Sequence, residues 1–168
     1  YVTGSNMSQI YGKMNATNGN IYLVNPNGVQ IGNSAQINVG SLYVSTKKID
    51  DIDKWTEKTN IEDSLRQIQT LNNAELMSLG YVTANKVTFE GKRVIIDMDR
   101  LQTPAMKSDT DTPNIHVVSI RDDTTGDYDI TKLDNRLYDV VLGSSDGKSA
   151  DWEKKMDFRN VKETNLTN

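Results

Sequence analysis

Apolar and polar residues alternate along the N-terminal part of the chain, between residues 21 and 46. A period of two is typical of β-strands, because successive side chains of a strand point to opposite faces. Turn-forming residues separate the short alternating runs, since Gly and Asn tolerate positive φ and Pro fixes φ. The apolar positions that we expect to point into a core are Ile21, Leu23, Val29, Ile31, Ile37, Val39, Leu42 and Val44.

Runs this short cannot bury an apolar face alone, so the strands must stack on others. Such stacking occurs in β-sandwiches and in parallel β-helices, where each coil lays its strands on those of the coil before it. The alternation resumes between Tyr81 and Leu101, with Asn85 and Gly91 as turn residues, and indicates two or three further coils. Periodicity therefore predicts an all-β fold, but it does not separate the sandwich from the β-helix.

A more charged segment, residues 47–80, interrupts this alternation. Asn60 is a suitable helix N-cap, and Gly80 is a suitable end. The apolar residues that recur near helical spacing are Ile61, Leu65, Ile68, Leu71, Leu76 and Leu79. We therefore expect a helical insertion near residues 56–79, within a segment of about 53–80.

The pattern is looser over residues 102–168, where turn-rich and charged stretches separate two apolar runs at 115–120 and 137–142. Each run is a candidate strand. A chain of 168 residues suits one domain with its own core. We expect residues 1–101 to form the β-rich region and residues 102–168 to continue it or to form a separate segment.

A succession of motifs between Gly4 and Thr46 points to a family. The segment reads GSNMSQIYGKMNATNGNIYLVNPNGVQIGNSAQINVGSLYVST. It holds a Gly-Ser-x-x-Ser-x-Ile-x-Gly lead, an Asn-Gly, an Asn-Pro-Asn-Gly turn, an Ala-Gln-Ile-Asn-Val-Gly strand and a closing Ser-Thr. These motifs in this order resemble the two-partner-secretion domain of filamentous-haemagglutinin-like exoproteins. The resemblance implies a right-handed parallel β-helix (solenoid), into which the helical segment would be inserted.

The resemblance also implies a function. Members of this family are exported through the periplasm and across the outer membrane by a β-barrel transporter, whose periplasmic domains recognise this region. The expected protein is a secreted or cell-surface bacterial adhesin, similar to filamentous haemagglutinin, that binds an unknown host or cell-surface receptor. Two alternatives remain open on the residues alone: a β-helical carbohydrate-active enzyme and a generic β-sandwich binding module.

Capping strands precede the Gly-Ser lead in this family. Without them, the first strands would present unpaired N–H and C=O groups, which can pair with another chain. We therefore expect residues 1–20 to be poorly ordered or to pair with a neighbouring molecule. Such pairing would permit self-association through an uncapped N-terminal edge.

Composition narrows the range of partners and of chemistry. The formal net charge of −4 argues against a nucleic-acid partner, which clustered Lys and Arg would bind. The chain has no cysteine, which excludes disulfides, thiolate metal sites and a nucleophilic Cys. Apolar residues make up 36% of the chain and aromatic residues 7%, which suits the narrow aliphatic interior of a solenoid.

Catalytic candidates are scarce. The single histidine, His116, has no second His with which to build a metal site or a Ser-His pair, so we interpret it as a surface or packed residue. No Gly-x-Ser-x-Gly, phosphate loop or nucleotide motif occurs. We expect no enzymatic activity and no cofactor.

One acidic stretch offers oxygen ligands for a metal ion. Asp122, Asp123, Asp127 and Asp129 surround Gly126, and Ca²⁺ accepts six to eight such ligands in irregular loops. The spacing misses the register of the EF-hand and lacks its bidentate Glu. We favour a solvated turn in which the carboxylates bond nearby amides, and keep calcium as the weaker hypothesis.

The sharpest motif is the turn formed by Asn25, Pro26, Asn27 and Gly28. Pro26 fixes φ, Asn27 tolerates a left-handed backbone, and Gly28 tolerates the backbone conformation at the end of the turn. The side-chain amide oxygen of Asn25 can accept a hydrogen bond from the backbone two residues on. We predict that its first role is structural, since it sets the register of Leu23 against Val29. Direct recognition by the transporter is the second hypothesis, because the corners of a solenoid are exposed.

Overall fold

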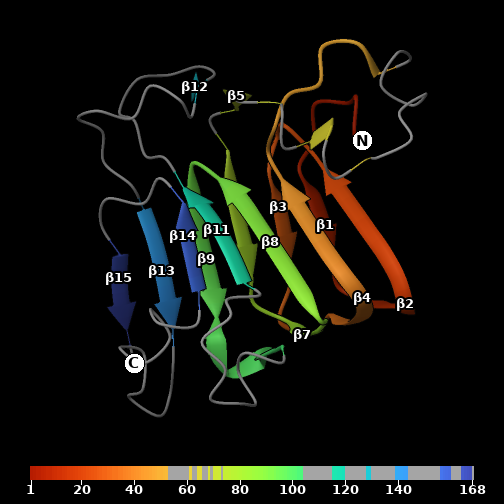
Figure 1. The fold of residues 1–168 in the computed structure, drawn as a ribbon, viewed down its shortest axis with the longest axis vertical. Helices are drawn as coiled ribbons and strands as arrows, with labels where there is room; N and C mark the ends of the chain where they lie inside the picture. The colour runs from red at the N-terminus through yellow and green to blue at the C-terminus, as the bar shows by residue number, and fades with distance from the viewer. Residues whose placement is uncertain are drawn as a thin grey trace.

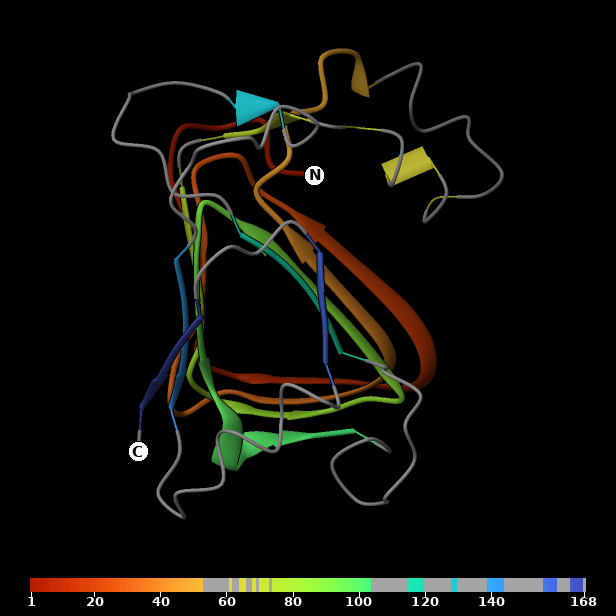
Figure 2. The same ribbon diagram turned by 60° about the vertical axis from the view of Figure 1, so that its left-hand side comes forward.

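A computed structural model describes residues 1–52, 61, 64–65, 68, 70–72 and 74–103, together with strands at 115–119, 128–129, 139–143, 156–159 and 164–167. Short strands joined by corners wind into a β-helix, whose triangular cross-section is visible in Figure 2. Each of the first four coils contributes a strand, or half of a long bent strand, to each of three faces. Among the described residues, no helix is long and apolar enough to cross a membrane.

The first two coils are continuous in the chain. They comprise β1 (Ser8–Ile10), β2 (Lys13–Val24), β3 (Val29–Ile31) and β4 (Gln36–Ser45). Both β2 and β4 run along two faces and bend between them, where their register shifts. A Cβ on Gly40 would lie 3.0 Å from the carbonyl oxygen of Gly19, so the close stacking of the two bends requires the glycine at position 40.

Two longer connections precede the later coils: one between β4 and β6, before the third coil, and one between β11 and β13, after the fourth coil. The third and fourth coils comprise β6 (Glu75–Ser78), β7 (Tyr81–Thr83), β8 (Lys86–Gly91), β9 (Arg93–Asp97), the 3-10 helix η1 (Met98–Arg100), β10 (Leu101–Gln102) and β11 (Ile115–Ser119). Beyond them lie β13 (Asp139–Gly143), β14 (Met156–Arg159) and β15 (Thr164–Thr167). The apolar runs at 115–120 and 137–142 thus contain β11 and most of β13.

Pairing between the coils is parallel in both main sheets. One sheet has the order β1-β3-β6-β9-β13-β15, and the other has the order β10-β7-β4-β8-β11-β14 with β2 paired to β4. Figure 1 shows β2, β4, β8 and β11 side by side. Parallel stacking of successive coils confirms the β-helix and rules out the β-sandwich. One antiparallel pair, β5 (Thr70–Leu71) with β12 (Tyr128–Asp129), joins the two long connections.

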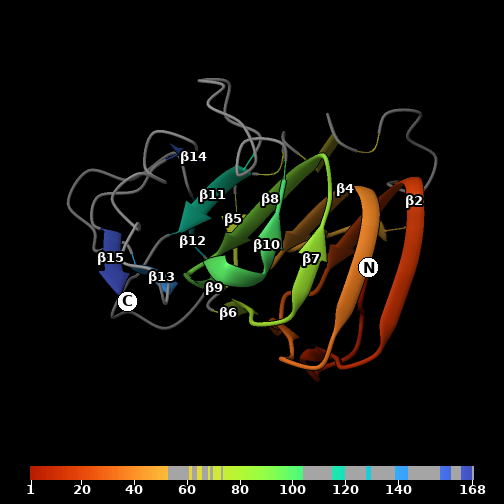
Figure 3. The ribbon, with the colours of Figure 1, turned by 90° about the horizontal axis from the view of Figure 1, so that it is seen from below.

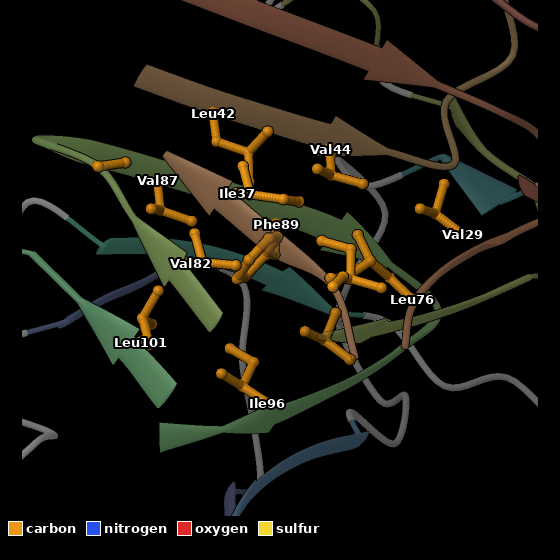
Figure 4. Packing of buried hydrophobic residues seen from close by; sticks show 14 of the residues in the cluster. Val29, Ile37, Leu42, Val44, Leu76, Val82, Val87, Phe89, Ile96 and Leu101 are labelled. Carbon is orange, nitrogen blue, oxygen red and sulfur yellow. The ribbon is translucent and has the colours of Figure 1, made fainter. Parts of the chain in front are cut away.

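Stacked apolar side chains fill the interior (Figure 4). Val29, Leu76 and Val94 occupy one row on successive coils, because their strands pair in that register. Six of the eight predicted core residues are buried: Val29, Ile31, Ile37, Val39, Leu42 and Val44. Ile21 and Leu23 also pack against the core but are only partly buried, because β2 has β4 as its partner on one side only among the described strands.

The helix predicted near residues 56–79 is wrong for residues 70–72 and 74–79. Residues 70–71 and 75–78 form β5 and β6, and Leu76 is fully buried in the solenoid core. Leu76 and Ser78 point inward, with period two, because β6 stacks between β3 and β9. Ile61, Ser64 and Leu65 are helical, and residues 53–60 lie outside the described part of the chain.

Candidate functional site

The Asn25–Gly28 turn forms the corner between β2 and β3. The backbone N–H of Gly28 donates to the carbonyl of Asn25 over 3.0 Å, which closes the turn. The amide N–H of Asn27 donates to Oδ1 of Asn25 over 2.9 Å, as predicted for the bond two residues on. The positive φ of the corner, 109°, falls at Gly28. A side chain at Gly28 would be strained, and its Cβ would lie 3.0 Å from the carbonyl oxygen of Glu75.

The side chain of Asn25 is fully buried and joins the turn to the preceding coil. Its Nδ2 donates to the carbonyl of Asn6 over 3.0 Å and to Oγ of Ser8 over 2.9 Å. Its Oδ1 accepts from the backbone and from the side chain of Asn27. Both donors and both acceptor positions of the amide are therefore used inside the protein.

The rest of the turn is tied to both neighbouring coils. Nδ2 of Asn27 donates to the carbonyl of Gly4 over 2.7 Å, and Nδ2 of Asn72 donates to the carbonyl of Pro26. Pro26 and Asn27 are half-buried, so only they present surface to a partner. The structural role and the recognition role of the turn both stay predictions, and the surface that a partner could contact belongs to Pro26 and Asn27.

Replacing Asn25 by Asp is expected to lower the free energy of unfolding by about 1–3 kcal/mol, because a carboxylate oxygen would replace Nδ2 beside the carbonyl of Asn6. Asn27→Asp should cost less, since that side chain is only half-buried. Denaturant unfolding of both variants measures the difference, and binding to the periplasmic domains of the transporter that the resemblance implies is measured in parallel. Unchanged stability of Asn25→Asp with lost binding would overturn the structural role.

Sequence reasoning missed a polar cluster on the outside of the solenoid. Nζ of Lys47 lies 3.0 Å from Oε2 of Glu90 and 3.0 Å from the hydroxyl of Tyr43, and it donates to the carbonyl of Leu65 over 2.8 Å. The Tyr43 hydroxyl also donates to Glu90. Ile49 and Leu65 cover this region together with Val24, so a lysine and a glutamate are both buried. The cluster therefore links Lys47 and Leu65, in the connection after β4, to Tyr43 on β4 and Glu90 on β8.

Most of the predicted metal candidates cannot be placed. Asp122, Asp123 and Asp127 lie outside the described residues, while Asp129 belongs to β12, whose backbone pairs with Thr70. The calcium hypothesis therefore stays a prediction. The backbone of His116 lies in β11, in register with Thr88 and Asp157.

The first coil is the end of both sheets in the described structure. β1 pairs with β3, and β2 pairs with β4, so the outer edges of β1 and β2 carry no further strand among the described residues. Residues 8–10 and 13–24 form strands there. Self-association through this edge stays a prediction.

Comparison with known proteins gives a family and two relatives. Residues 1–103 match the family described as TPS secretion domain. A heme/hemopexin-binding protein of Haemophilus influenzae is 39% identical over 101 residues, which cover 54% of this chain and 11% of the relative. Another heme/hemopexin-binding protein of Haemophilus influenzae is 49% identical over 59 residues, which cover 35% of this chain and 6% of the relative. The chain thus spans about a tenth or less of these relatives, and no solved structure matches it significantly.

Proposed function

The chain belongs to the TPS secretion domain family, and from this premise we propose that it is the segment by which a large adhesive exoprotein is recognised and exported. Proteins with this domain are secreted through outer-membrane transporters, so the chain is part of a two-partner-secreted exoprotein. Its proposed partner is such a transporter, whose periplasmic domains would bind the β-helix before export.

One observation carries this proposal. The family match covers residues 1–103, and these residues contain every described strand from β1 to β10. The matched region therefore includes the Asn25–Gly28 corner, the first three coils and the start of the fourth. A partner that recognises this family would find its binding surface on this stretch, whatever follows it in the exoprotein.

The action of the whole exoprotein outside the cell is a separate part of the proposal. We propose that it acts by binding a surface and not by catalysis, with adhesion to a host or cell-surface receptor as the first candidate. A second candidate follows from the two relatives, which are named for binding heme and hemopexin. The regions of similarity cover only 11% and 6% of those relatives, so the binding activity of such an exoprotein would reside mainly outside this segment.

The export role is tested by producing the chain with a periplasmic signal peptide, with and without a two-partner-secretion transporter. We expect the chain in the medium only when the transporter is present, and direct binding to the purified periplasmic domains in calorimetry. A variant with the first coil deleted, residues 1–24, removes β1 and β2 and should stay in the periplasm. Equal export without the transporter, or no binding of the folded chain to its periplasmic domains, would contradict the proposal.

A further inference from the structure

A groove runs across the outer surface of the face formed by the first half of β2, the first half of β4, and β7. Figure 3 shows these strands side by side, with β10 next to β7. The groove is lined by Lys13, Met14, Asn15, Gln36, Ile37, Asn38, Tyr81 and Thr83. The groove lies on the lateral face of the sheet, which further coils stacked on β2 would extend and would not cover.

Register arranges the polar lining in two rows along the axis of the solenoid. Lys13, Gln36 and Tyr81 are aligned on three successive strands in the first row. Asn15, Asn38 and Thr83 are aligned in the second row, and Gln102 on β10 continues it. Neighbouring strands are about 4.8 Å apart, so each row offers one polar side chain at nearly that interval.

These side chains are exposed and have hydrogen-bonding capacity to spare. Within the described part of the chain, Gln36, Asn38 and Thr83 make no side-chain hydrogen bond, and Asn15 accepts one from Thr17. Amides and hydroxyls both donate and accept hydrogen bonds, as sugar hydroxyls do. The lining holds no carboxylate and one lysine, which favours a neutral ligand over a cation or a polyanion.

An aromatic ring stands at one side of the groove. Tyr81 is 52% exposed, and the guanidinium of Arg100 lies 4.9 Å from the centroid of its ring. Arg100 is itself held by the carbonyls of Asn33 and Leu79, at 2.8 and 3.2 Å. Arg100 thus contacts the ring, while Tyr81 as a whole stays about half exposed. An amphipathic aromatic surface beside amides is well suited to the apolar face of a pyranose.

From these observations we propose that the groove binds a neutral oligosaccharide, which lies along the solenoid axis. One pyranose unit of an extended glycan is about as long as the spacing between strands, so successive units would meet successive coils. Asn15, Asn38 and Gln36 would hydrogen-bond ring hydroxyls, and Tyr81 would pack against one sugar face. This site is distinct from the proposed export role, which does not depend on a sugar.

The test uses the full chain and three neutral hexasaccharides as probes: cellohexaose, maltohexaose and N-acetylchitohexaose. NMR titration should shift the amide signals of the groove strands with at least one probe. Tyr81→Ala and Asn38→Asp should each raise the dissociation constant about tenfold or more. Tyr11→Ala is the matched control, because Tyr11 is 51% exposed and lies outside the groove lining, and it should bind as the original chain does.

Melting temperatures and binding to the transporter's periplasmic domains are measured on the same three variants. Melting temperatures within about 4 °C of the original chain's and unchanged transporter binding, with saccharide binding lost in the two groove variants, would support the proposal. It would be overturned if none of the three probes binds, or if Tyr11→Ala weakens binding as much as Tyr81→Ala. Loss of transporter binding in the groove variants without any saccharide binding would also overturn it. The groove would then be a protein contact, and the proposed export function would stand.

Discussion

Replacing Lys47 by Met is expected to lower the free energy of unfolding by about 3–5 kcal/mol, because removal of one partner leaves a buried charge without its counterion. Lys47 is 1% exposed, and its Nζ lies 3.0 Å from Oε2 of Glu90, whose side chain is 5% exposed. The variant would keep the aliphatic volume but leave the Glu90 carboxylate with the Tyr43 hydroxyl and no cation. Such a loss is a large share of the stability of a domain of this size.

Denaturant unfolding followed by circular dichroism measures this loss. Lys48→Met is the matched control, because Lys48 is the exposed neighbour in the chain, and we expect a change within about 0.5 kcal/mol there. The double variant Lys47→Met with Glu90→Leu should recover most of the stability, since both buried charges are then removed. If Lys47→Met unfolds at the same denaturant concentration as the original chain, the ion pair does not hold the connection in place.

Replacing Phe89 by Ala is expected to cost about 3–5 kcal/mol, through lost transfer energy and the cavity left behind. Phe89 is fully buried in β8, where Figure 4 shows it among the interior side chains. It is in register with Val44 on one side and Val117 on the other. It therefore occupies the middle of an interior row, where stacked strands above and below restrict collapse of the cavity.

Thermal and denaturant unfolding of Phe89→Ala measure this cost. Tyr81→Ala is the control for loss of an aromatic ring, and we expect it to cost about 1 kcal/mol or less, because the ring is exposed and its main contact is with Arg100. Similar losses for Phe89→Ala and Tyr81→Ala would contradict the burial of Phe89 in the interior row.

The period-two pattern predicted the strands and most of the core correctly, because alternation is a local property of an extended backbone. Val29 and Ile31 were placed inward on this basis, and both are fully buried. Local chemistry also predicted the bond between Oδ1 of Asn25 and the N–H of Asn27, since both groups belong to one turn. The order of motifs from Gly4 to Thr46 predicted the family and the parallel β-helix.

The prediction for the segment after β4 failed where tertiary stacking overrides local spacing. Leu76 and Leu79 lie three residues apart, as neighbours on one face of a helix would, yet Leu76 belongs to a strand. A four-residue strand such as β6 has little stability alone. It forms because β3 and β9 supply hydrogen-bonding partners on both edges, and neither neighbour is adjacent in the sequence.

Sequence alone therefore determined which segments are extended, which of their side chains face inward, where the chain turns and which family it belongs to. Only the tertiary structure decided which strands become neighbours. Long connections join the second coil to the third and the fourth coil to the later ones, and their sequence does not determine the register in which the strands of these coils pair. That register brings Glu90 to Lys47 and aligns Lys13, Gln36 and Tyr81 in one row. A lysine normally stays in water, and it is buried here because a distant strand supplies a carboxylate and a covering segment excludes solvent.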